Sequence, residues 1–215
     1  MPLQLYYITD RRQFPGEGHE QEQRLVAKIA ECAAAGVEYI QLREKDLETR
    51  ELEELALKAM AALSGSRTHL LINSRTDVAL ACGAHGVHLP ANDLSASEVR
   101  SIFARAGNSE PVIGFSTHSV AEVASAEAHG ASFAVFGPVF EKSGSANREG
   151  LEQLRRICHR AEAAQPPMPV WALGGISLEN AGQCVAAGAA GIAAIRLFQQ
   201  NDVNALMKKL KSLQA

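Results

Sequence analysis

VWALGGISLENAGQCVAAGAAGIAAIR (170–196) contains one complete strand, turn, helix and strand unit. An apolar run over 170–175 ends in two glycines, a segment of helical period follows over 178–188, and a second apolar run covers 191–195. Runs that are apolar throughout are typical of parallel strands buried on both faces. The stretch therefore predicts a parallel sheet that is covered by helices.

The same unit recurs along the whole chain. Strands are predicted at 5–9, 37–42, 69–73, 86–89, 112–116, 133–137, 170–175 and 191–195. Helices are predicted at about 20–35, 47–63, 79–82, 95–107, 120–130, from about 148 onward, 178–188 and 202–213. Eight units of about 25 residues favour a closed (βα)8 TIM barrel over an open, doubly wound α/β sheet. We expect one domain over residues 1–215.

Composition narrows the class of protein. Of the 215 residues, 47% are hydrophobic, which is enough for a sizeable core. A net charge of −3 gives no general field for nucleic acid or an anionic membrane, so a bound phosphate has to be held by local groups. No apolar run approaches the roughly 20 residues that cross a bilayer, and the start MPLQLYYITDRR does not resemble a secretion signal. We therefore expect a cytoplasmic protein with no nucleic-acid or membrane partner.

The cysteines are widely spaced and form no CxxC pair. They are Cys32, Cys82, Cys158 and Cys184. Most of them fall in alanine-rich helical segments, where a free cysteine behaves as a small apolar residue. We expect buried, reduced thiols and neither a disulfide nor a metal site.

Polar or glycine residues lie at the C-terminal ends of most of the predicted strands, where the working residues of a barrel are found. They are Gln41, Arg43 and Lys45 at the second strand, Asn73 at the third, Asp93 at the fourth, Ser116 and His118 at the fifth, Lys142 at the sixth, Gly174 and Gly175 at the seventh, and Arg196 at the eighth. Their convergence on one rim predicts a single functional site.

Two of these groups favour an anionic ligand. Gly174 and Gly175 let backbone N–H groups approach a phosphate before a helix N-terminus, in the corner where barrels usually bind phosphate, and Arg196 lies beside it. A tight strand-to-helix turn is the alternative for the glycines. Gln41, Arg43 and Lys45 share one side of a continuing strand and would point into the barrel mouth. The alternative for these charges is a loop paired with Glu44, or a solvated run.

His118 is the candidate general base or acid, since it follows the fifth strand beside Ser116. A loop histidine that only makes a hydrogen bond is the alternative. The histidines at 69, 85 and 88 lie in or beside strands and are expected to be packed.

The chain resembles the thiamine phosphate synthase/TenI family from end to end. The matching pieces are YYITDR (6–11), QLREK (41–45), INSRTDVA (72–79), GAHGVHLPANDL (83–94), GFSTHS (114–119), FGPVFEKSGS (136–145), LEQL (151–154), VWALGGIS (170–177) and GAAGIAAI (188–195). The resemblance implies a TIM barrel that works in the assembly of the pyrimidine and thiazole halves of thiamine.

The family includes synthases, which join a pyrimidine diphosphate to a thiazole phosphate with Mg²⁺, and this chain departs from their pattern. Ser74 stands where synthases have a metal-binding Asp, although the second metal Asp is matched by Asp93. The synthase loop GPVFPTxTK reads GPVFEKSGS here, and Arg196 replaces a Ser. Mg²⁺ prefers carboxylate and phosphate oxygens, so a neutral Ser is a poor replacement.

What remains resembles the TenI branch, whose thiazole tautomerases aromatise a carboxythiazole phosphate by proton transfer. In that branch the His of a GxSxHS-like motif is the base, which the resemblance assigns to His118. The substrate phosphate would lie on Gly174, Gly175 and Arg196, and its carboxylate on Lys45 or Lys142, with no cofactor. The alternatives are a Mg²⁺-dependent synthase, using Asp93 as a metal ligand, and a barrel that binds phosphate ligands without turnover. The oligomeric state stays open, a homo-oligomer included.

Overall fold

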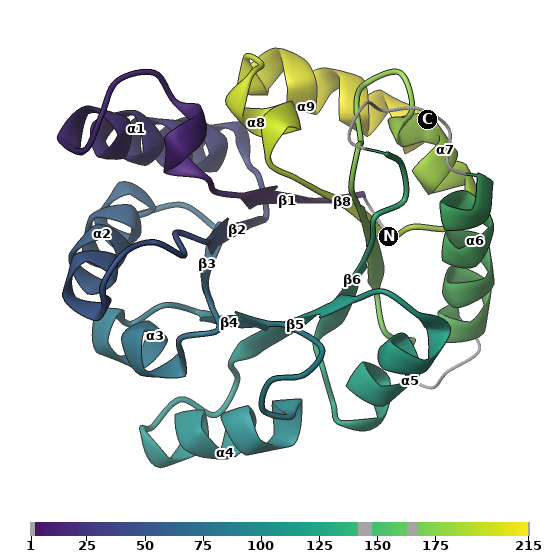
Figure 1. Ribbon diagram of the computed structural model, residues 1–215, viewed down its shortest axis with the longest axis horizontal. Coiled ribbons are helices and arrows are strands. Elements are labelled where there is room, and N and C mark those ends of the chain that lie inside the picture. The colour runs from purple at the N-terminus through teal and green to yellow at the C-terminus, as the bar shows by residue number, and fades with distance from the viewer. Residues whose placement is uncertain (1–2, 142–147, 163–166, 215) are drawn as a thin grey trace.

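The computed structural model describes residues 3–141, 148–162 and 167–214, which form a closed barrel of eight parallel strands in chain order (Figure 1). The strands are β1 (Gln4–Ile8), β2 (Tyr39–Leu42), β3 (His69–Asn73), β4 (Gly86–Leu89), β5 (Val112–Thr117), β6 (Phe133–Phe136), β7 (Val170–Leu173) and β8 (Gly191–Ala194). The prediction of a (βα)8 barrel is confirmed.

Helices surround the barrel (Figure 1). They are α1 (His19–Ala35), α2 (Thr49–Ala62), α3 (Thr76–Cys82), α4 (Ala96–Arg105), α5 (Val120–Ala128), α6 (Arg148–Glu162), α7 (Ala181–Ala186), α8 (Arg196–Gln199) and α9 (Val203–Lys211), with the 3₁₀ turns η1 (Arg11–Gln13) and η2 (Ser212–Gln214). Within the described ranges, none of these helices is both long enough and apolar enough to cross a membrane.

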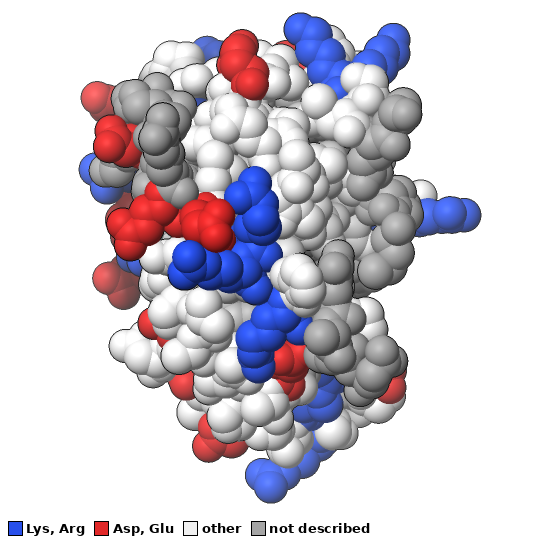
Figure 2. All heavy atoms as spheres, turned by 90° about the vertical axis from the view of Figure 1, so that its right-hand side faces the viewer, with Lys and Arg blue, Asp and Glu red and all other residues white. Residues whose placement is uncertain are grey.

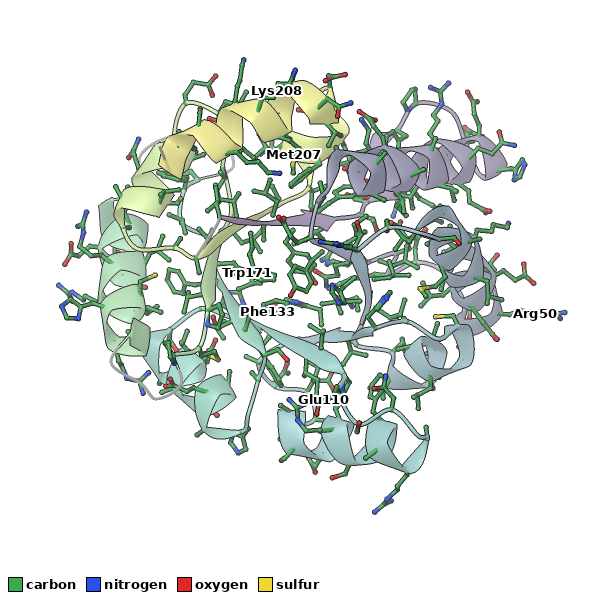
Figure 3. All side chains as sticks on the ribbon, turned by 180° about the vertical axis from the view of Figure 1, so that it is seen from behind. Arg50, Glu110, Phe133, Trp171, Met207 and Lys208 are labelled. Carbon is green, nitrogen blue, oxygen red and sulfur yellow. The ribbon has the colours of Figure 1, made fainter. Side chains whose placement is uncertain are left out.

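Apolar side chains fill the barrel below its mouth. One interior cluster consists of Tyr6, Ile8, Leu71, Phe133, Val135, Trp171 and Ala193. The rings of Phe133 and Trp171 stack at a centroid distance of 3.7 Å and lie together inside the barrel (Figure 3). The barrel is therefore a packed core, and polar chemistry is confined to its ends.

The outer face of α6 carries basic side chains that are paired with acids. Arg155 and Arg156 both contact Glu152, at 3.0 and 3.2 Å, and Arg160 lies 3.4 Å from Glu127 of α5. Figure 2 shows basic and acidic side chains side by side on the face that carries α6. These ion pairs leave that helix with a mixed surface.

Several predicted boundaries differ from the observed ones, and those of β8 and α7 have a local cause. β8 ends at Ala194, because Ile195 already has helical backbone angles and Arg196 begins α8. α7 covers a shorter segment than 178–188, because the Asn180 side chain holds the preceding turn: its Oδ1 accepts the N–H of Ser177 and its amide donates to the carbonyl of Gly175. The prediction that the cysteines are buried is confirmed for all four.

His88 lies at the centre of the barrel, between the apolar core and the mouth. Its side chain is only 2% exposed, its Nδ1 lies 3.2 Å from the Tyr6 hydroxyl, and its Nε2 lies 2.8 Å from Ser116 Oγ. Burial lowers the pKa of His88 to about 3, and the nearby positive charge of Arg43 adds to the shift. The ring is therefore neutral in the folded protein.

We predict that stability falls as the pH drops below about 6.5, the ordinary pKa of histidine, because the unfolded chain then binds a proton that folded His88 rejects. The contribution of His88 approaches about 1.4 kcal/mol per pH unit between the two pKa values. Urea unfolding between pH 7.5 and 5 checks the slope, with His88→Gln as the comparison. Equal slopes for wild type and variant would contradict the prediction.

Candidate active site at the C-terminal rim of the barrel

Side chains from β2 to β5 meet on one side of the mouth. The amide of Gln41 donates to Asn73 Oδ1 at 2.8 Å, and the amide of Asn73 lies 3.3 Å from Ser74 Oγ. Ser116 reaches the same interior through its contact with His88. The structure therefore brings Gln41 and Asn73 into contact and joins Ser116 to His88.

Arg43 presents a free charge close to this group. It is half-buried, and its charge is near enough to the His88 ring to lower the pKa of that histidine. Among the residues that the structure describes, none makes a hydrogen bond or ion pair with its guanidinium. Glu44 is instead paired with Arg11, at 3.1 Å, so the alternative of an Arg43–Glu44 pair is wrong.

The prediction that Lys45 shares the side of the barrel on which Arg43 lies assumed a strand that continues through residue 45. β2 ends at Leu42, so the alternation of a strand does not continue as far as Lys45. Lys45 is exposed and lines a hollow of about 310 Å³ with Leu42, Leu52 of α2 and Asn73. Leu42 and Leu52 belong to the core between sheet and helices, whereas Asn73 contacts Gln41, so this hollow lies at the C-terminal edge of β2 and β3.

His118 is held at the rim in one tautomer. Its Nδ1 lies 2.6 Å from the carbonyl oxygen of Gly137, at the end of β6. A carbonyl oxygen can only accept, so Nδ1 carries the proton and a neutral ring has a free lone pair on Nε2. The backbone N–H of His118 donates to Glu122 of α5 at 2.7 Å, which fixes the residue from its other side. The ring is exposed and able to take a proton from a ligand.

The glycines after β7 have a structural role. Both have positive φ angles, and a Cβ at Gly174 would lie 2.6 Å from Cα of Pro138. They therefore allow the β6–α6 loop to lie against β7, where the N–H of Phe140 donates to the carbonyl of Gly174 at 3.1 Å. Within the described ranges, the N–H groups of Gly174 and Gly175 donate no hydrogen bond.

The three remaining residues predicted for the site are Arg196, Asp93 and Lys142. Arg196 is exposed as the first residue of α8. It follows β8, which pairs with β7, the strand that precedes Gly174 and Gly175. Asp93 is exposed, its Oδ1 accepts the N–H of Leu94, and it lines a hollow of about 260 Å³ with Thr117 and Glu122. Lys142 lies outside the described residues.

Comparison with known proteins connects this rim to a family. The sequence pattern of the family described as "Thiamine monophosphate synthase" matches residues 5–198. The chain belongs to this family. The chain is 42% identical over 197 residues to "Putative thiamine-phosphate synthase" of Geobacter sulfurreducens. The aligned region covers 89% of this chain and 84% of that protein.

Further relatives agree. "Putative thiamine-phosphate synthase 2" of Aquifex aeolicus is 37% identical, over 90% of this chain and 96% of that protein. The solved "Thiamine phosphate pyrophosphorylase" of Pyrococcus furiosus superposes with a TM-score of 0.78 at 32% identity, and the match covers 98% of this chain and 95% of that one. The chain is thus an enzyme of thiamine biosynthesis, in a family that acts on small phosphorylated substrates.

The family's Mg²⁺ does not fit the described residues. Ser74, at the position that resembles a synthase Asp, offers a neutral oxygen and has a left-handed backbone with φ of 59°. Asp93 lies with Thr117 and Phe115 in the hollow between α4 and α5. In the part of the chain that the structure describes, no three His, Cys, Asp or Glu side chains are grouped to hold a metal ion.

Several residues of the site are missing from the sequence prediction. His88 and Tyr6 lie below Ser116, and Thr9 and Arg11 hold Glu44. Side chains alternate between the two faces of a strand, so Gly86 and His88 share one face of β4. This alternation could have predicted that His88 points into the barrel if Gly86 was taken to face the interior. No local pattern connects Arg11 to Glu44.

We predict that Gly175→Ala destabilises the protein by about 1–3 kcal/mol and weakens phosphate binding. The new Cβ would collide with the carbonyl oxygen of Glu141 and lie 2.8 Å from Phe140 Cβ, at a φ of 60°. Gly182→Ala in α7 is the matched control, since its nearest atom is Leu213 Cδ2 at 3.7 Å, and it is expected to be neutral or stabilising. Urea unfolding and phosphate titration measure both. Equal stability of the two variants would contradict the prediction.

Proposed function

We propose that this chain is a thiazole phosphate tautomerase, which converts a carboxythiazole phosphate tautomer to its aromatic form by proton transfer, without a metal or organic cofactor. One observation carries the proposal: the Gly137 carbonyl fixes the His118 proton on Nδ1 and leaves Nε2 as a base at the rim. Positioned general bases typically accelerate reactions by about 10²–10⁴-fold.

The reaction needs a base that removes a proton and a proton donor that returns one to the substrate. His118 Nε2 removes the proton from C2 of the ring, and the electron pair of that C–H bond moves into the ring system. A second group or a water gives a proton to the exocyclic carbon, where a new C–H bond forms. Aromatisation of the ring supplies the driving force, so the protein's part is to orient the substrate and to hold the proton.

The substrate would be held by its two anionic ends. The N–H groups of Gly174 and Gly175, with Arg196 nearby, suit the phosphate. Arg43 suits the carboxylate, because its charge faces the interior and Lys45 lines a separate hollow. A role for Lys142 stays a prediction outside the described residues. β2 and β8 lie on either side of β1 in the closed sheet (Figure 1).

A Mg²⁺-dependent thiamine-phosphate synthase is the second candidate, and the comparisons favour it. The relatives from Geobacter, Aquifex and Pyrococcus all carry synthase or pyrophosphorylase names. Such an enzyme joins a pyrimidine diphosphate to a thiazole phosphate and releases diphosphate. Ser74 weighs against it, because a neutral hydroxyl stands at the position that resembles a metal-binding Asp of the synthases.

We predict that His118→Gln lowers tautomerase turnover by about 10²–10⁴-fold while substrate binding changes little. The assay follows the C2 proton signal of the carboxythiazole phosphate tautomer by NMR in the absence of metal. His129→Gln is the matched control, since His129 is another exposed histidine, at the end of α5, and contacts the Ser125 carbonyl. Full turnover by His118→Gln would refute the assignment of the base.

A further inference from the structure

The carboxylate next to Arg43 in the sequence is turned away from it. Glu44 is only 4% exposed, and Thr9 Oγ1 donates to its Oε1 at 2.6 Å. The backbone N–H of Arg11 contacts both carboxylate oxygens, at 3.2 and 3.1 Å, and the Arg11 guanidinium donates to Oε2 at 3.1 Å. Burial raises the pKa of Glu44, and these hydrogen bonds oppose the shift.

Thr9 connects this carboxylate to the backbone of Arg43. While its hydroxyl donates to Glu44, its Oγ1 accepts the N–H of Arg43 at 2.9 Å. The N–H of Thr9 also donates to the carbonyl of Gln41 at 3.0 Å, so the β1–β2 pairing continues beyond Ile8. These contacts hold residues 41–44 in alternation, with Arg43 toward the interior and Glu44 toward the outside.

Arg11 also binds the next acid along the loop. Its two terminal nitrogens donate to the two carboxylate oxygens of Asp46, each at 2.8 Å. This bidentate ion pair, in which the guanidinium forms a fork around the carboxylate, lowers the pKa of Asp46. Residues 43–46 are all charged, and Arg11 from the loop after β1 pairs with both acids among them, Glu44 and Asp46. The side chains of Arg43 and Lys45 have no hydrogen-bond or ion-pair partner among the described residues.

We propose that Arg11 is a positioning residue for ligand binding: by holding Glu44 and Asp46 it keeps the charge of Arg43 unpaired for the anionic group of the ligand. An unpaired, half-buried cation attracts an anion more strongly than one that already has a carboxylate partner. The proposal rests on the proposed function in one respect, which is that the ligand presents an anion to Arg43.

The test is a titration with inorganic pyrophosphate, followed by calorimetry, in a series of full-length variants. Arg11→Gln is expected to weaken binding about tenfold, because Glu44 and Asp46 then compete for the cations. The double variant Arg11→Gln/Glu44→Gln is expected to recover most of that loss. Arg50→Gln, which removes an exposed partner of Glu54 on α2, is the control and should bind as wild type.

A second comparison shows whether the effect passes through Arg43. In an Arg43→Gln background, Arg11→Gln should have little further effect. Melting temperatures separate loss of folding from loss of binding, and Arg11→Lys, which keeps the charge but not the fork, gives an intermediate affinity if Arg11→Gln does not fold.

Three results would overturn the proposal: unchanged affinity in Arg11→Gln, no recovery in the double variant, or no pyrophosphate binding by wild type. Failure of the tautomerase assignment is distinguishable from these, because it would appear as absent turnover while the pyrophosphate series behaves as expected.

Discussion

The pairing of β1 with β8 closes the sheet, and the shared rim of the barrel depends on it. Gln4 to Tyr7 lie in register with Gly191 to Ala194. A Cβ at Gly191 would lie 2.6 Å from Trp171 Cδ1 and 2.7 Å from the Gln4 carbonyl oxygen, so glycine is required where the last strand meets the first. Closure then places strand ends from every part of the chain around one mouth. Arg43, His118 and Gly174 lie at this one end of the barrel for this reason.

Charge and packing are divided along the barrel axis. The Phe133–Trp171 stack fills the interior, and neutral His88 lies between Tyr6 and Ser116 above it. Electrostatic interactions at the mouth are strengthened by this apolar floor, because fewer water molecules screen them from below. Glu44 lies on the outer side of the wall and is only 4% exposed, and a buried unpaired acid is unfavourable, which is the physical reason that Glu44 needs both Thr9 and Arg11.

Much of the fold could be predicted from the sequence, because strand period and strand order are local properties. The ends of β2 and β3, which carry Gln41 and Asn73, were placed correctly for the same reason, whereas β5 extends to Thr117 and β7 ends at Leu173, before the glycines. The side on which Lys45 lies could not be predicted, since it depends on β2 ending at Leu42. The tautomer of His118 depends on a carbonyl from another strand, and the partner of Glu44 lies in another loop. Such long-range contacts leave no trace in spacing.

One experiment distinguishes thiazole tautomerase activity from thiamine phosphate synthesis most directly. Wild-type protein is given the carboxythiazole phosphate tautomer, the pyrimidine diphosphate and Mg²⁺ together, and products are followed by proton and phosphorus NMR. Tautomerase activity predicts that the aromatic carboxythiazole phosphate accumulates while the phosphorus signals of the pyrimidine diphosphate persist. Release of inorganic diphosphate with formation of thiamine phosphate would contradict it and establish the synthase.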